Sequence, residues 1–153
     1  MTIAASIVSL TIAGPAMADT KSTVQSFYDF LSNPGSEKHA TTFRNSVSAD
    51  WKSIGDYSGK SKNADQLVGQ VQGFGKLIPD LNWKVEEMID AGDRIIVRGH
   101  ATGTPQGPLF GVDGKGKGFS IMSIDIHTLE NGKIVKTYHV EDWSSAIRQL
   151  SAQ

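Results

Sequence analysis

The sequence predicts an α+β fold, because its hydrophobic pattern changes from helical to alternating near Pro79. Before this proline, apolar residues recur at helical spacing; after it, four long segments alternate apolar and polar residues. Helices and strands therefore form separate blocks, which favours an α+β domain over βαβ units. With 153 residues, 39% of them hydrophobic, the chain can bury one sizeable core, so we expect a single domain over residues 19–153.

The first eighteen residues have the character of a signal peptide. An apolar run leads to Ala16-Met17-Ala18, the small-x-small pattern that signal peptidase accepts, although no Lys or Arg precedes the run. The segment is also shorter than the about 20 apolar residues needed to span a bilayer. We therefore expect residues 1–18 to be removed and the protein to be periplasmic or secreted, without membrane attachment once processed.

Three helices are expected before Pro79, and a short one at the end of the chain. The first begins at a capping box formed by Ser22 and Gln25, and the third begins at Asn63, which can cap it. The expected ranges are 22–31, 37–47, 63–78 and 144–150.

One short strand and four long strands are expected, over 51–54, 83–89, 94–103, 119–129 and 133–143. The loop 104–118 is longer than most hairpin connections and holds Leu109 and Phe110 at its middle. Two adjacent large apolar side chains at a loop tip normally cover something, so this loop is either mobile or a lid.

The last hairpin gives a prediction of register. If Asn131-Gly132 is a two-residue turn, Glu130 pairs with Lys133 and the ladder follows from there. One face, expected to line a ligand cavity, would then carry Ile121, Ser123, Asp125, His127, Lys136, Tyr138, Val140 and Asp142. The other face would carry Met122, Ile124, Ile126, Val135, Thr137, His139, Glu141 and Trp143, and its apolar character suggests a second subunit of a homodimer or higher oligomer.

Asp142 is the main catalytic candidate in this register. A carboxylate on a mostly apolar face loses hydration, which raises its pKa and suits proton exchange near neutral pH. The alternative is a solvated aspartate at a strand end. His100 shares a strand face with Arg98 and points either into the cavity or to solvent, and His127 either pairs with Asp125 or shares a solvated face with it.

Several function classes lack support in the sequence. Net charge is −1 with both signs interspersed, so nucleic acid is not an expected partner. The chain has no cysteine, and its four histidines show no metal-binding motif, so no metal site is expected. There is no dinucleotide fingerprint or GxSxG, and no cofactor is expected.

Five ordered stretches carry a family resemblance. They are Leu77-Ile78-Pro79-Asp80-Leu81, residues 91–98 (AGDRIIVR), Ala101-Thr102-Gly103-Thr104, Asn131-Gly132-Lys133-Ile134-Val135 and Arg148-Gln149-Leu150. In order and spacing the chain resembles the SnoaL-like polyketide cyclase, or ester cyclase, family from Ser22 to Leu150.

The resemblance implies a nuclear-transport-factor-like cone, in which a strongly curved, mostly antiparallel sheet wraps round about three N-terminal helices. It implies ring closure by aldol chemistry without a cofactor, with Asp142 at the position of the family's catalytic aspartate. We therefore expect an exported domain that binds a small hydrophobic carbonyl compound, with Asp142 assisted by His100 or His127; the alternative is a non-catalytic binding or interaction module. The expected substrate-binding residues are Tyr28, Trp51, Phe74, Arg98, Asp125 and Tyr138.

Overall fold

Four helices and five strands make up the fold in the computed structural model, which describes residues 15–152. In chain order they are α1 (Pro15–Ser32), α2 (Glu37–Ser46), β1 (Val47–Ile54), α3 (Ala64–Leu77), β2 (Asn82–Asp90), β3 (Arg94–Gly103), β4 (Phe119–Glu130), β5 (Lys133–Glu141) and α4 (Trp143–Ser151). The expected division into an N-terminal helical part and a C-terminal sheet is confirmed, with β1 inserted between α2 and α3.

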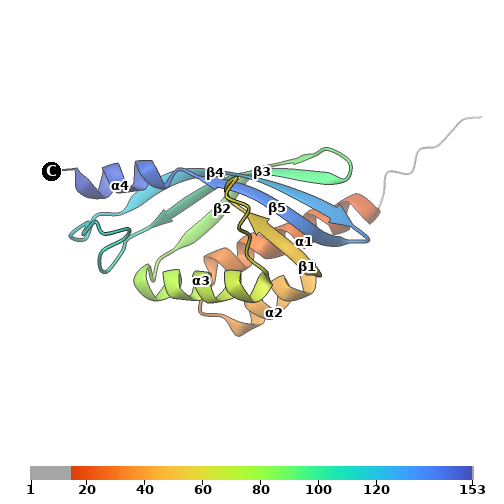
Figure 1. Ribbon diagram of the computed structural model, residues 1–153, viewed down its shortest axis with the longest axis horizontal. Coiled ribbons are helices and arrows are strands. Elements are labelled where there is room, and N and C mark those ends of the chain that lie inside the picture. The colour runs from red at the N-terminus through yellow and green to blue at the C-terminus, as the bar shows by residue number, and fades with distance from the viewer. Residues whose placement is uncertain (1–14, 153) are drawn as a thin grey trace, which may run out of the picture.

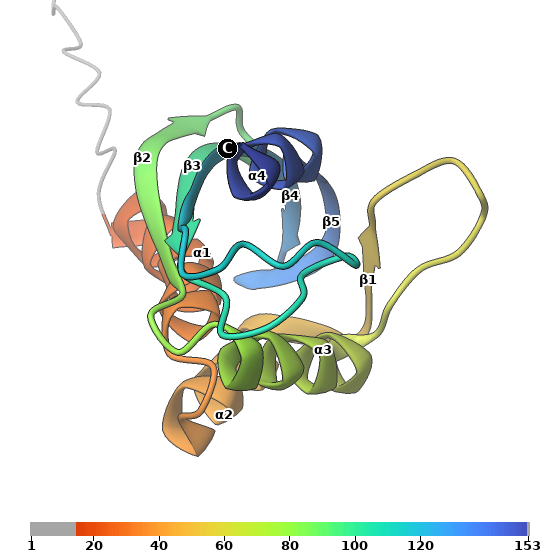
Figure 2. The same ribbon diagram turned by 90° about the vertical axis from the view of Figure 1, so that its left-hand side faces the viewer.

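The five strands form one sheet in the order β1-β5-β4-β3-β2. Every neighbouring pair is antiparallel except β1 and β5, which are parallel. Helices α1, α2 and α3 lie on one side of the sheet (Figure 1), and an end-on view shows the strands curving round that side (Figure 2). This is the curved sheet around three helices that the resemblance implied.

The core lies between the helices and the concave face of the sheet, and aromatic rings fill much of it. Phe27 of α1 meets Phe43 of α2 and Trp51 of β1 at ring-centroid distances of 5.5 and 6.3 Å. Burying each such ring stabilises the fold by about 1.5–3 kcal/mol. These contacts fix α1 and α2 against β1, and so hold one wall of the site described below.

The helix boundaries are partly as expected. The capping box of α3 is confirmed: Asn63 Oδ1 accepts from the Gln66 amide at 2.9 Å, and Gln66 Oε1 accepts from the Asn63 amide at 2.9 Å. The capping box at Ser22 is wrong, because α1 is already helical from Pro15. The expected cleavage point after Ala18 thus falls within α1, while residues 1–14 of the expected signal peptide lie outside the described residues.

The register of the β4–β5 hairpin differs from the expected one after a single pair. Asn131 and Gly132 form the expected turn with positive φ values of 51° and 74°, and Glu130 pairs with Lys133. Leu129 then pairs with Ile134, but Thr128 pairs with Lys136, so Val135 is an extra residue in β5. Such a β-bulge moves every following side chain of β5 to the opposite face.

The loop 104–118 closes with a tight turn rather than running free. Leu109 and Val112 exchange two backbone hydrogen bonds of 2.9 and 3.0 Å across Phe110 and Gly111, both of which have positive φ. Leu109 is buried, and Phe110 stands above it with half of its surface exposed. Within the described part of the chain, no helix is long and apolar enough to cross a membrane.

Candidate functional site

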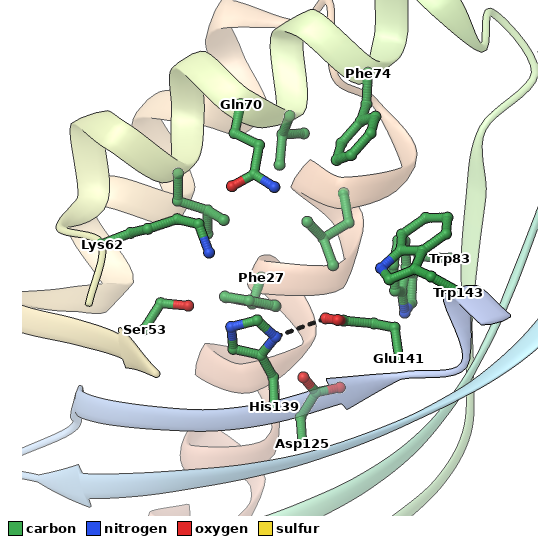
Figure 3. A pocket seen from close by; sticks show the side chains of 13 residues that line it. Phe27, Ser53, Lys62, Gln70, Phe74, Trp83, Asp125, His139, Glu141 and Trp143 are labelled. Atoms are coloured by element: carbon green, nitrogen blue, oxygen red, sulfur yellow. Dashed lines mark hydrogen bonds and ion pairs between the residues drawn. The ribbon is translucent and has the colours of Figure 1, made fainter. Parts of the chain in front are cut away.

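A cavity lies between α1, α3 and the concave face of the sheet, with about 530 Å³ of space not occupied by protein atoms. Each of these elements contributes side chains, and the first residue of α4 closes one side (Figure 3). The lining residues are Phe27, Leu31, Ser53, Lys62, Leu67, Gln70, Val71, Phe74, Trp83, Asp125, His139, Glu141 and Trp143.

Three titratable side chains of β4 and β5 meet at the floor of this cavity. Asp125 is the ladder partner of His139, and Glu141 follows His139 at the strand's period of two, so all three point to the same face. His139 Nδ1 lies 2.7 Å from Glu141 Oε1, and Figure 3 shows Asp125 beside the pair. Two acids and one imidazole thus face an otherwise largely apolar space.

Asp125 is almost completely buried, and its environment determines its charge. Burial is the main cause that raises its pKa to about 7, and the negative charge of Glu141 raises it further. Hydrogen bonds that Tyr28 and Ser123 donate to Oδ2, at 3.0 and 3.4 Å, oppose the rise. Because Oδ2 accepts both bonds, Oδ1 is the oxygen left to exchange a proton with a molecule in the cavity.

A chain of buried donors leads from the core to Asp125. Trp51 Nε1 donates to Thr137 Oγ1 at 3.1 Å, and this hydroxyl lies 3.0 Å from His127 Nδ1. His127 Nε2 lies 2.9 Å from the Tyr28 hydroxyl. The arrangement that uses every donor runs from Trp51 through Thr137, His127 and Tyr28 to Asp125, with the His127 proton on Nε2.

This arrangement requires a neutral imidazole. Burial lowers the pKa of His127 to about 3, and the charge of His139 contributes in the same direction, so His127 stays neutral near pH 7. Burial, followed by the charge of Asp125, likewise holds the pKa of Tyr28 well above its ordinary value. Both groups therefore act as fixed hydrogen-bond partners that orient Asp125.

A second donor reaches Asp125 from β2. Trp83 Nε1 donates to Ser123 Oγ at 3.1 Å, and Ser123 in turn donates to Asp125. Gly99 of β3 lies between the two, and a Cβ there would come within 2.4 Å of Ser123 Oγ and 3.1 Å of Trp83 Nε1. Glycine at this position therefore lets the bond cross β3.

His139 has the opposite tendency to His127. Burial alone would lower its pKa, but the hydrogen bond and charge of Glu141, with the charge of Asp125, outweigh this and raise it. Its Nε2 atom is buried and has no hydrogen-bond partner among the described residues. Figure 3 shows this nitrogen pointing to the side of the cavity where Ser53 lies.

Aromatic rings form the other side of the cavity. Phe74 stacks on Trp143 at a centroid distance of 5.7 Å, and Trp83 meets Trp143 at 6.2 Å. Phe110 of the long loop packs against Trp143 and Phe74 at 5.4 and 6.3 Å. The expectation that this loop tip covers something is therefore supported, because its ring covers two residues of the cavity wall.

Asp142 does not lie in the cavity, and the expected position of its side chain is wrong. It is exposed at the N-cap of α4, where Oδ1 accepts from the Ser145 amide at 2.9 Å and from the Ser144 hydroxyl at 2.7 Å. The hydrogen bond from the Ser145 hydroxyl is the main cause that lowers its pKa to about 2. The bulge at Val135 moves Asp142 out of the predicted register, and Glu141 faces the cavity instead.

Three further candidates lie on the outer face of the sheet. Tyr138 follows the same shift of register and is 42% exposed. Arg98 forms an exposed ion pair with Glu87 at 3.3 Å, and His100 Nε2 lies 2.7 Å from the Ser120 hydroxyl. Their assignment to the cavity is wrong, because the alternating strand pattern fixes which residues share a face but not which face is covered.

The remaining candidates lie at or next to the cavity. Phe74 and Asp125 line it, as expected. Tyr28, Trp51 and His127 are fully buried beneath it, and of these Tyr28 bonds Asp125 directly. His139 and Glu141 were missed as site residues; a sequence signal for the bulge would have identified them, and the pattern around Val135 contains none.

The cavity gives no basis for a metal site. Within residues 15–152, no three His, Asp or Glu side chains are grouped closely enough to hold a metal ion. Asp125, His139 and Glu141 form instead a set suited to exchanging protons.

The comparison with protein families agrees with this architecture. The family model of the SnoaL-like polyketide cyclases matches residues 22–150. The chain belongs to this family. No curated protein sequence matches the chain significantly.

Solved structures of other members of the fold superimpose over most of the chain. TsrD from Streptomyces laurentii is 17% identical, with a TM-score of 0.76 over 92% of this chain and 100% of its own. IdmH from Streptomyces antibioticus, described as a candidate polyketide cyclase, is 20% identical, with a TM-score of 0.75 over 87% of this chain and 99% of its own. At these identities the similarity establishes the nuclear-transport-factor-like fold of this SnoaL-like protein, while its chemistry depends on its own side chains.

Proposed function

We propose that this SnoaL-like protein binds a small, largely apolar carbonyl compound and moves a proton at the carbon next to the carbonyl. The observation that carries the proposal is the convergence of Asp125, His139 and Glu141 on one wall of a cavity otherwise lined mainly by apolar side chains. Such proton transfer is the first step of both aldol-type cyclisation and isomerisation, and neither needs a cofactor.

Asp125 is the proposed base. With a pKa of about 7, a large fraction of its carboxyl groups is ionised at neutral pH, and the ionised form is a stronger base than a solvated aspartate. Its Oδ1 takes the proton from carbon, the C–H electron pair forms the enolate, and the protonated Asp125 returns the proton to carbon or to the oxygen of an aldol product. The negative charge of Glu141 supports the basicity of Asp125, and its bond to His139 holds it in place.

The reaction itself is argued from the site, because related structures carry different assignments. IdmH is described as a candidate polyketide cyclase, and AclR from Streptomyces galilaeus, 20% identical, as a candidate hydroxylase. Membership of the family therefore supports small-molecule binding, and the three titratable side chains support acid–base chemistry.

Deuterium exchange tests the proposal without knowledge of the natural substrate. Aryl ketones such as 1-tetralone, whose uncatalysed exchange is slow, are incubated in D₂O with the protein, and incorporation at the α carbon is followed by mass spectrometry. Quenching of tryptophan fluorescence reports binding separately, since Trp83 and Trp143 line the cavity. We expect catalysed exchange that falls at least 100-fold in Asp125→Asn and about 10-fold in Glu141→Gln.

Asp142→Asn is the matched control, because its carboxyl group lies outside the cavity. Loss of exchange in this variant, with Asp125→Asn unaffected, would reject the assignment. Binding without exchange would favour the alternative, a non-catalytic binding protein. Circular dichroism and melting curves establish that each variant is folded.

We also propose that the protein forms a homodimer through the outer face of the sheet. Met122, Ile124 and Val140 lie there with 55%, 40% and 67% of their surfaces exposed, next to Tyr138. Exposed apolar patches of this kind mark interaction sites. Light scattering should give twice the monomer mass, and Ile124→Lys combined with Val140→Lys should give the monomer; a monomeric wild type would reject the dimer.

Export is proposed from the N-terminal sequence alone. The pattern Ala16-Met17-Ala18 supports cleavage after Ala18. N-terminal sequencing of the protein recovered from the periplasm or medium of an expressing bacterium should begin at Asp19; full-length protein confined to the cytoplasm would contradict it.

A further inference from the structure

We infer that the end of the cavity next to β1 is an anion subsite, formed by Lys62, Ser53 and His139, that binds a carboxylate group of the substrate. This inference rests on the proposed function of the cavity and adds a substrate class to it: a carbonyl compound that has an apolar ring system at one end and a carboxylate at the other.

The backbone places Lys62 and Ser53 together. Their main chains exchange two hydrogen bonds of 2.9 and 3.0 Å in an antiparallel bridge, which ties the end of the loop after β1 to this strand. Both side chains line the cavity. Figure 3 shows the Lys62 amine and the Ser53 hydroxyl on the same side of it, next to the ring of His139.

All three groups have hydrogen-bonding capacity that the described protein does not use. Lys62 forms no ion pair with any described carboxylate, although it is half-buried. Ser53 is 2% exposed, and no described residue accepts from its hydroxyl. His139 Nε2 is buried without a partner. Buried polar groups normally have partners, so three unused ones at one end of a cavity indicate that a ligand supplies them.

The fit around His139 keeps its unpartnered nitrogen in place. A Cβ at Gly55 would lie 2.9 Å from His139 Cε1 and 3.1 Å from Nε2, so only glycine lets β1 run this close to the ring. On its other side the ring is held by Glu141. Nε2 is thereby directed to the side of Ser53 rather than free to turn away.

The charges at this end favour a single negative group. When His139 is protonated, its charge is balanced by Glu141, and the positive charge of Lys62 remains uncompensated. An ammonium, a hydroxyl and an imidazolium N–H provide three donors, which suit the two oxygens of one carboxylate. The rings of Phe74, Trp83 and Trp143 at the opposite side provide the complementary apolar surface (Figure 3).

A matched pair of ligands tests the subsite. Binding of 2-naphthoate and of 2-naphthamide, which share one ring system and differ in charge, is measured by tryptophan fluorescence and calorimetry. Wild type should bind the acid at least 10-fold more tightly than the amide, and added salt should reduce this preference. Lys62→Met should bind both ligands with the affinity that wild type has for the amide.

Lys60→Met is the control, since Lys60 is exposed on the same loop and does not line the cavity; it should keep the wild-type preference for the acid. Equal binding of acid and amide by wild type, or an unchanged preference in Lys62→Met, would overturn the subsite and leave the exchange of neutral ketones standing. Failure of both ligands to bind would overturn the subsite and the proposed function of the cavity together.

Discussion

Asp125 lies directly opposite His139 in the β4–β5 ladder, and both side chains point into the cavity. This relationship depends on Val135, the extra residue in β5. Without it, the regular ladder from the Asn131-Gly132 turn would place Tyr138 opposite Asp125 and direct His139 to the outer face. One bulged residue therefore decides which side chains of β5 form the site.

Deleting Val135 tests this dependence. The shortened strand would direct Lys136 into the core or break the hairpin, so we expect the deletion to abolish cooperative unfolding in urea. Val135→Ala keeps the number of residues and should retain a cooperative transition close to that of wild type, because Val135 is only half-buried. A deletion variant as stable as wild type, with exchange activity intact, would show that the bulge has no such role.

Substitution of Asp142 should affect stability and not the site. Asp142→Ala removes the side chain that accepts from Ser145 and Ser144 at the start of α4, so the melting temperature should fall by a few degrees. Asp142→Asn retains capping capacity and should lose less. Binding of 2-naphthamide should be unchanged in both variants; a loss of binding at an unchanged melting temperature would contradict the capping role.

Removal of the Tyr28 hydroxyl should alter both stability and pH dependence. Tyr28→Phe leaves the His127 Nε2–H without an acceptor in the core, at a cost of about 1–3 kcal/mol in the free energy of unfolding. It also removes a bond that lowers the pKa of Asp125, so that pKa should rise.

The readout is the pH profile of deuterium exchange, whose rise with pH should move to higher pH in Tyr28→Phe. Tyr57→Phe is the control, because Tyr57 is fully exposed and lies far from the network in sequence. An unchanged profile in Tyr28→Phe would mean that the hydroxyl does not act on Asp125.

Asp125 and His127 should change the pH dependence of stability in opposite directions. The folded-state pKa of Asp125, about 7, lies above its unfolded value of about 4, so the folded protein binds more protons in this interval and stability falls as pH rises through it. The folded-state pKa of His127, about 3, lies below its unfolded value of about 6.5, so stability rises with pH between the two.

Urea unfolding of two variants separates these contributions. Relative to wild type, Asp125→Asn should gain stability as pH rises from about 4 to about 7, at up to about 1.4 kcal/mol per pH unit. His127→Gln should lose stability relative to wild type as pH rises from about 3 to about 6.5. Differences with the same sign in both variants would show that one of the two pKa shifts is in the wrong direction.

The sequence by itself determined the α+β class, the long strands, the cap of α3 and the Asn131-Gly132 turn. Each of these depends on local properties: hydrophobic period, capping side chains and the positive φ that asparagine and glycine tolerate. The family resemblance added the curved sheet. Two of the expected site residues, Phe74 and Asp125, also line the observed cavity.

Only the tertiary structure decided the rest of the site. The bulge at Val135 has no local signature, and it exchanged Asp142 and Tyr138 for Glu141 and His139. Period-two alternation also leaves open which face of a strand the helices cover, so the outward position of Arg98 was not predictable from β3 alone. Register and coverage arise from contacts between segments far apart in the chain, and local patterns do not record them.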